Sequence, residues 1–165
     1  MHKAKERRTK SSRVGIDFGG TIGFVDNDEP IPQSFQMIRH LIHKYGASNV
    51  FIVSKAGPAM VEKTKIWFQK TDFFQHTGFV VENVTFVREC EEKAGVVQSL
   101  NINIFFDDSY KVVRCLAPLP MIERIFWMSA KPEQIKLVER KYRHKIAMTK
   151  RWGSTMKFFQ GCPPR

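Results

Sequence analysis

Short apolar runs alternate along the chain with longer segments in which apolar residues recur at helical spacing. The strand-like runs are residues 13–17, 49–54, 84–87, 102–107 and 122–128. Runs of this length, rich in Val, Ile and Phe and bounded by turn residues, are typical of strands that are buried on both faces. We therefore expect a parallel sheet of about five strands.

The segments between these runs have the pattern of helices. They cover residues 33–45, 59–70, 91–100, 110–116 and 132–142. In the first of them apolar residues recur every three or four positions, and Gly46 fits the position that follows a helix end. Strands that alternate with helices predict a three-layer α/β/α domain with a Rossmann-like parallel sheet.

The domain is expected to cover residues 13–145, between a disordered basic tail (1–12) and a basic C-terminal extension (146–165). No apolar run approaches the roughly 18 residues of a membrane span, so we expect no membrane partner. The three cysteines, Cys90, Cys115 and Cys162, are an odd number and form no CxxC pair. This favours a reducing, cytoplasmic location.

Positive charge is concentrated at the two ends of the chain. The net charge of +11 divides into +5 over residues 1–13, −2 over 14–130 and +8 over 131–165. Basic ends attract nucleic acid through counterion release, although such segments also serve only as a solvated surface or close an oligomer interface. Arg7 and Arg8, with the lysines around them, also fit a nuclear-import patch.

Acidic side chains stand at the ends of two predicted strands. Asp17 ends the first strand, and Asp107 and Asp108 end the fourth. Ligands of a parallel sheet bind beyond the carboxyl ends of its strands, so these carboxylates are expected to meet. Carboxylates without His or Cys suit Mg²⁺, and a bound cation relieves their mutual repulsion. The alternative is that the aspartates only cap the helices that follow.

Candidate phosphate-binding groups lie at the same edge of the sheet. Gly20 and Thr21 follow the first strand, where backbone N–H groups can face an anion. Ser54 and Lys55 follow the second strand and offer a hydroxyl and an ammonium group. Lys93 lies at the start of the helix predicted over residues 91–100, before the fourth strand. It can offset negative charge near Asp17, or it is a surface lysine beside three glutamates. Lys55 competes for the same role.

Four of these segments resemble, in order and spacing, the four motifs of the haloacid dehalogenase (HAD) superfamily. They are VGIDFGGT (14–21), NVFIVS (49–54), Lys93 and FFDDS (105–109). The intervals are 37 residues from Asp17 to Ser54, 39 to Lys93 and 14 to Asp107. The resemblance covers about residues 13–128 and implies the strand order 5-4-1-2-3.

The resemblance implies a Mg²⁺-dependent phosphohydrolase, a phosphatase that acts through an aspartyl-phosphate on Asp17. On this interpretation Ser54 and Lys93 hold the phosphoryl group. The implied metal ligands are Asp17, Gly19 through its carbonyl, Asp107 and Asp108. Asp108 is favoured over Asp107 as the direct ligand.

Gly19 departs from the family pattern. Phosphatases of the family carry an acid two residues after the nucleophile, where it protonates the leaving group and activates water. Loss of such a group typically lowers the rate about 10²–10⁴-fold. Asp26 and Asp28, in the loop that follows, are the candidates to replace it. The alternative function is a catalytically inactive HAD-like module that binds a phosphorylated or nucleic-acid partner.

The first connection has little room for a cap domain, because only about 15 residues separate Asp17 from the first helix. We expect an uncapped site, which suits a macromolecular phosphorylated substrate. Residues 15–21 also resemble the first phosphate loop of sugar kinases with the actin-like fold, in which residues 22–25 would form the second strand of a hairpin. That fold needs two similar domains and gives no role to residues 105–109.

Overall fold

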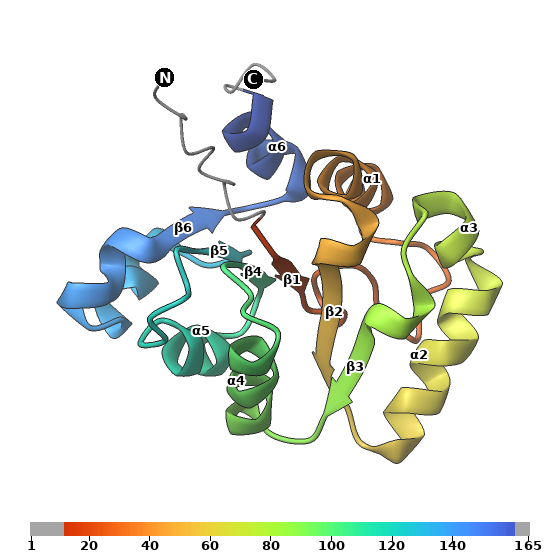
Figure 1. The fold of residues 1–165 in the computed structure, drawn as a ribbon, viewed down its shortest axis with the longest axis horizontal. Coiled ribbons are helices and arrows are strands. Elements are labelled where there is room, and N and C mark those ends of the chain that lie inside the picture. The colour runs from red at the N-terminus through yellow and green to blue at the C-terminus, as the bar shows by residue number, and fades with distance from the viewer. Residues whose placement is uncertain (1–11, 161–165) are drawn as a thin grey trace, which may run out of the picture.

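The computed structural model describes residues 12–160 and contains a sheet of six parallel strands in the order β3-β2-β1-β4-β5-β6 (Figure 1). The strands are β1 (Val14–Ile16), β2 (Val50–Lys55), β3 (Val84–Val87), β4 (Ile104–Asp107), β5 (Arg124–Met128) and β6 (Ile146–Thr149). The five expected strands are all present in the expected order, but the number is corrected to six because β6 adds to the edge beyond β5.

Helices cover both faces of this sheet (Figure 1). One face carries α1 (Ser34–Tyr45), α2 (Pro58–Lys70), α3 (Phe73–Thr77) and α6 (Trp152–Gln160). The other carries α4 (Cys90–Ser99) and α5 (Tyr110–Leu116). Two short 3-10 helices, η1 (Ala47–Asn49) and η2 (Val81–Asn83), lead into β2 and β3. The three-layer α/β/α architecture is therefore confirmed.

Two apolar cores, one on each face of the sheet, hold the layers together. Successive residues of a strand point to opposite faces. Phe106 accordingly stacks on Phe126 of the neighbouring strand, with ring centroids 4.6 Å apart, beneath Trp152 of α6. Phe105 and Trp127 are buried in the other core, against α4 and α5. Burying each such side chain contributes about 1.5–3 kcal/mol to folding.

The segment expected to be a C-terminal extension contributes to the domain up to the last described residue. β6 pairs in parallel with β5, and Ala147 and Thr149 are buried. Trp152, the first residue of α6, is also buried, and its indole Nε1 donates a hydrogen bond of 2.7 Å to the carbonyl of Thr21. The sheet and its covering helices therefore continue beyond residue 145.

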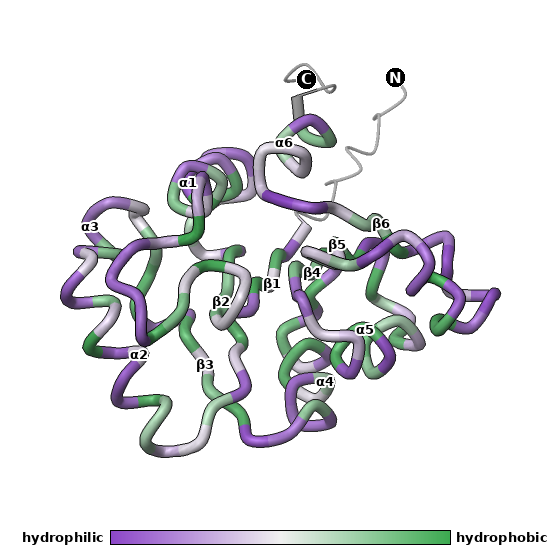
Figure 2. Tube along the Cα trace, turned by 180° about the vertical axis from the view of Figure 1, so that it is seen from behind, coloured by the Kyte–Doolittle hydropathy of each residue, from purple (hydrophilic) through white to green (hydrophobic). Residues whose placement is uncertain are grey.

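The helix expected over residues 132–142 is replaced by two 3-10 helices, η3 (Pro132–Leu137) and η4 (Arg140–Lys145). Val138 separates them in an extended conformation and is buried in the core that lies against α4 and α5. A continuous α-helix does not permit that conformation. Figure 2 shows many hydrophilic residues along this connection between β5 and β6.

Residues 17–33 form a compact loop rather than a second domain or a hairpin. The N–H groups of Thr21, Ile22 and Gly23 all donate to the carbonyl of Phe18, which closes a tight turn. Residues 22–25 are not a strand, so the hairpin of the sugar-kinase alternative is not formed. Among residues 12–160, no helix is both long enough and apolar enough to cross a bilayer.

Candidate active site

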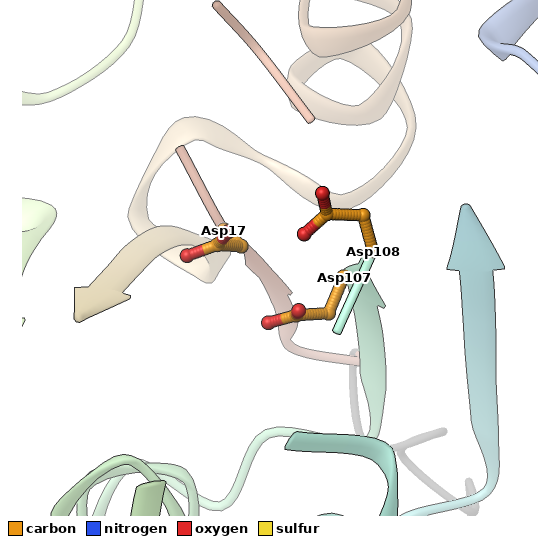
Figure 3. A group of neighbouring side chains, drawn as sticks. All are labelled: Asp17, Asp107 and Asp108. Atoms are coloured by element: carbon orange, nitrogen blue, oxygen red, sulfur yellow. The ribbon is translucent and has the colours of Figure 1, made fainter. Parts of the chain in front are cut away.

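Two adjacent strands bring the acidic cluster together. β1 and β4 are neighbours with Ile16 opposite Phe106, and the N–H of Asp17 donates to the carbonyl of Phe106 at 2.9 Å. Asp17 directly after β1 and Asp107 at the end of β4 are therefore held side by side, with Asp108 one residue further (Figure 3). Three carboxylates meet at the carboxyl edge of the sheet, as the strand pattern predicted.

Lys93 lies between two of these carboxylates. Its Nζ donates to Asp17 Oδ1 at 2.9 Å and to Asp107 Oδ2 at 2.8 Å. α4 begins immediately beyond β3, so its first turn lies over the same edge of the sheet. The side chain of Lys93 is only 1% exposed, which excludes the alternative of a surface lysine. A buried ammonium of this kind is retained only when it is paired.

The cluster shifts the pKa values of its members. Burial, and then the negative charge of Asp17, raise the pKa of Asp107 to about 7 despite its contact with Lys93. The same two causes raise the pKa of Asp108. Burial alone would lower the pKa of Lys93, but the charges of Asp17 and Asp107 outweigh it and raise that pKa. Negative charge thus exceeds what Lys93 neutralises.

The acidic cluster fits a hard divalent cation. Asp17, Asp107 and Asp108 each offer an oxygen within 4.8 Å of the others, and oxygen ligands are those of Mg²⁺. Both oxygens of Asp107 already accept hydrogen bonds, Oδ2 from Lys93 and Oδ1 from the N–H of Ser109 at 2.8 Å. Asp108 is exposed and forms no contact of that kind with Lys93. This difference favours Asp108 over Asp107 as a direct ligand.

A cleft of about 360 Å³ opens over the cluster. Ser54 lines it and is buried, so its hydroxyl lies where the second strand was expected to deliver it. Lys55 also lines the cleft, but its half-exposed side chain lies 3.9 Å from Glu89. Asp17, Gly19, Lys93 and Asp107 complete the predicted residues that the structure brings to this cleft.

Gly20 and Thr21 do not present their N–H groups to the cleft. The N–H of Gly20 donates to the carbonyl of Gly23, and that of Thr21 to the carbonyl of Phe18, each at 3.1 Å. Gly20 has a φ of +73°, and a Cβ there would collide with the carboxylate of Asp108. The structure thus assigns this glycine a steric role, and the expected anion-binding N–H groups of Gly20 and Thr21 serve the loop instead.

The position of the missing acid is open. A Cβ on Gly19 would meet nothing within 4 Å, and Gly19 lines the cleft. Of the two candidate replacements, Asp26 lines the same cleft and lies 3.8 Å from Lys63. Asp28 lines a separate hollow and pairs with Lys70 at 3.3 Å. Only Asp26 is therefore placed near the acidic cluster.

Sequence reasoning missed the apolar wall of the cleft. Phe24, Val25 and Met60 line it, and Phe24 and Met60 are 54% and 41% exposed. Phe24 and Val25 lie in an irregular loop, so no helix or strand periodicity predicts the direction of their side chains. The only signal in the sequence was Phe24, an aromatic residue two positions before the polar stretch of residues 26–30.

Each of the three tryptophans supports a loop of the site. Their indole N–H groups donate to backbone carbonyls: Trp67 to Asn27 at 2.7 Å, Trp127 to Asp108 at 3.3 Å and Trp152 to Thr21 at 2.7 Å. A large side chain from α2, β5 or α6 thus holds each carbonyl by a side-chain hydrogen bond. These hydrogen bonds hold the loop after β1, which begins with Asp17, and the residue after β4, Asp108.

No family model matches this chain, and no curated protein matches it. The solved structures with similar folds include the following two. One is the D,D-heptose 1.7-bisphosphate phosphatase from B. bronchiseptica, complexed with magnesium and phosphate, with a TM-score of 0.61 and 12% identity over 92% of this chain and 99% of that one. The other is a de novo designed Rossmann 3x3 protein, with a TM-score of 0.54 and 12% identity over 93% and 96%.

At 12% identity these likenesses establish the fold. The chain has a Rossmann-like α/β/α fold, which this phosphatase shares. A designed protein shares the same arrangement of layers, so the fold alone assigns no chemistry.

Proposed function

We propose that this chain is a Mg²⁺-dependent phosphohydrolase of the HAD type that acts through an aspartyl-phosphate on Asp17. The observation that carries the proposal is the junction at the floor of the cleft, where Lys93 pairs with Asp17 and Asp107 while Asp108 stands beside them. A cleft with a positioned carboxylate, a buried ammonium and a hydroxyl suits phosphoryl transfer.

Each residue of the cleft has a separate role in phosphoryl transfer. A carboxylate oxygen of Asp17 attacks phosphorus, and the bond from phosphorus to the leaving oxygen breaks with its electron pair going to the leaving group. Water then displaces Asp17 and releases phosphate. Lys93 orients the nucleophile and offsets the charge of the incoming phosphoryl group, to which Ser54 donates. Asp17, Asp108 and Asp107, with the Gly19 carbonyl, would hold a Mg²⁺ ion, which would supply further charge neutralisation.

Catalysis is slow because the position of Gly19 holds no group that transfers a proton. The exposed side chain of Asp26 is the nearest substitute that the loop provides. Loss of general acid–base catalysis leaves the nucleophile and the charged groups intact, at a cost of about 10²–10⁴-fold in rate.

The test is phosphate release from a broad panel of phosphate esters, with Mg²⁺ and with EDTA. Asp17→Asn should lower the rate more than about 10³-fold, since it removes the nucleophile. Asp72→Asn, an exposed aspartate away from the cleft, is the matched control. Calorimetry should show Mg²⁺ binding that Asp17→Asn and Asp108→Asn weaken. Turnover that survives Asp17→Asn contradicts the proposal.

A second candidate is a non-catalytic module that binds a phosphorylated or nucleic-acid partner. The connection from β5 to α6 supports it, because it carries several exposed cations: Lys131, Lys136, Arg140, Lys141, Lys150 and Arg151. Of these, Lys141 pairs with Glu139 at 3.1 Å. Two others in that connection serve the fold, since Arg143 donates to the carbonyls of Val138 and Lys136, and Lys145 donates to those of Ala117 and Leu119. The basic residues 1–11 lie outside the described part.

Gly19→Asp separates the two functions. A Cβ added at Gly19 meets nothing within 4 Å, so a side chain can begin there without strain. Activity that rises in this variant supports the enzyme. Silence of wild type and Gly19→Asp across the whole panel supports the binding module.

A further inference from the structure

We infer that the cleft takes aryl phosphates, whose leaving group departs as a phenolate and needs no proton. The inference rests on the proposed function and names its substrate class. Two features of the cleft support it. Its carboxyl groups are either hydrogen-bonded or exposed to solvent, and its wall carries apolar side chains.

Every carboxyl group that lines the described cleft either accepts hydrogen bonds from protein groups or is exposed to solvent. Asp17 and Asp107 both accept from Lys93, and Asp107 accepts from Ser109 as well. The side chain of Asp26 is 86% exposed and lies near Lys63. A Cβ on Gly19 would stand in open space. No lining carboxyl group of residues 12–160 is thus both buried and unengaged, as a tuned proton donor should be.

A leaving oxygen that receives no proton must depart as an anion. The oxygen of a phenol such as tyrosine has a pKa of about 10. That of an alkyl alcohol is close to the value of bulk water, about 15.7. Departure without protonation therefore favours a phenolate strongly over an alkoxide. Lys55 and Lys111 line the cleft and stabilise the developing negative charge on a phenolate.

The wall of the cleft suits the ring of the same leaving group. Phe24 and Met60 are exposed apolar side chains at the cleft, with Val25 beside them. An aromatic ring buries apolar surface against them and gains ring–ring and sulfur–ring contacts. Phosphate binds at the charged floor while the ring lies on this wall. Free aryl phosphates and phosphotyrosyl side chains of a polypeptide share this chemistry.

The step balances without any co-reactant. Asp17 forms a bond to phosphorus as the bond from phosphorus to the phenolic oxygen breaks, and the electron pair leaves with the phenolate. Water then forms a bond to phosphorus, the bond to Asp17 breaks, and the proton of water passes to the solvent.

The experiment compares four substrates of the Mg²⁺-loaded full chain. Phenyl and benzyl phosphate both carry a ring, but only the first has a leaving group of low pKa. Acetyl and ethyl phosphate repeat that difference without a ring. We expect kcat/KM, which reports the departure of the leaving group, to be at least about 100-fold higher for phenyl phosphate than for benzyl phosphate, the lower limit of a missing general acid. Gly19→Asp should reduce this ratio by restoring benzyl phosphate turnover.

The wall is tested by binding, which needs no turnover. In calorimetry benzylphosphonate should bind at least tenfold more tightly than methylphosphonate. Phe24→Ala and Met60→Ala should shrink that ratio, whereas Ile66→Ala, an exposed apolar residue on α2 outside the cleft, should preserve it. Comparison of free phosphotyrosine with phosphotyrosyl peptides then distinguishes the two sources of the ring.

The outcomes separate the inference from the proposed function. Benzyl phosphate hydrolysed within tenfold of phenyl phosphate, or equal binding of the two phosphonates, overturns the aryl specificity and leaves the phosphohydrolase in place. No turnover of any of the four substrates, or turnover that survives Asp17→Asn, overturns both.

Discussion

Lys93 and its two carboxylates form one electrostatic unit rather than three separate residues. Asp107 is 0% exposed, and its charge is tolerated only because Lys93 lies 2.8 Å away. Removal of the ammonium would leave two buried carboxylates facing each other. Such a change is strongly destabilising, because the buried negative charge is no longer compensated. The charge state of Asp17, the proposed nucleophile, is therefore linked to the stability of the fold.

The raised pKa of Asp107 predicts a pH-dependent stability in the absence of metal. Asp107 binds its proton up to about pH 7 when folded, but only up to about 3.8 at its ordinary value. Between these values the folded state holds the extra proton, so the free energy of unfolding falls as pH rises, by on the order of 1.4 kcal/mol per pH unit. Asp107→Asn should remove this slope in urea unfolding with EDTA.

The control for that measurement is Asp72→Asn, an exposed position. Its unfolding free energy should follow wild type at every pH. A difference between wild type and Asp107→Asn that stays constant from pH 4 to pH 7 would refute the assignment.

The spacing of residues along the sequence identified the candidate site residues, but it did not predict which of them contact one another. Asp17, Lys93 and Asp107 were identified by their order in the chain, and the structure brings them within hydrogen-bond distance. The sequence did not reveal that Lys93 bridges both acids, since contacts between α4 and two different strands depend on packing. Gly20 was misread because a glycine needed for steric reasons and one needed for an anion look alike in sequence.

At the scale of elements, the loop after Asp17 is stabilised by helices from distant parts of the chain. Trp67 of α2 and Trp152 of α6 each donate an indole hydrogen bond to it. The loop carries Gly19 and Phe24, which line the cleft, so the two helices determine the shape of the site without entering it.

Trp152→Phe should destabilise the protein by about 1–3 kcal/mol. Phenylalanine keeps an aromatic ring against Phe106 but leaves the carbonyl of Thr21 without its indole donor. The urea midpoint reports the change. Phe158→Leu, at an exposed position of the same helix, should stay within about 0.5 kcal/mol of wild type. Equal stability of Trp152→Phe and wild type would exclude a contribution from this hydrogen bond.

Strands and helices with strong periodicity were predictable, and the C-terminal third was less so. The spacing of Ile135, Val138 and Tyr142 mimics a helical face, but Val138 reaches the core from an extended backbone between η3 and η4. β6 is four residues long and lies between basic residues, so charge obscured its alternation of half-buried and buried positions. Short edge strands are recognised through their pairing, which only the folded sheet supplies.

At the scale of the whole molecule, the chain combines a nearly neutral centre with basic ends. The net charge is −2 over residues 14–130 and +8 over 131–165. The structure shows that part of this basic charge is consumed by the fold, since Arg143 and Lys145 donate to backbone carbonyls. The exposed remainder is the part available to a partner.

The exposed cations predict salt-dependent binding of polyanions. In filter binding with unrelated single-stranded RNA and DNA, log affinity should fall linearly with log salt, by roughly 0.7–0.9 per phosphate contact. Combined replacement of Lys136, Arg140, Lys150 and Arg151 by Gln should flatten this slope. Replacement of Lys63, Lys65 and Lys70 of α2 is the control and should preserve it. Absence of binding at low salt contradicts the prediction.

The hydrogen bond from Trp152 to Thr21 joins residues 131 positions apart. β1 likewise pairs with β4, about ninety positions later in the chain. A ribosome releases the N-terminal part first, so the segment that bears Asp17 emerges long before either β4 or Trp152. A nascent chain that stalls before residue 152 therefore carries every residue that lines the cleft but lacks the hydrogen bond by which Trp152 holds the loop after Asp17.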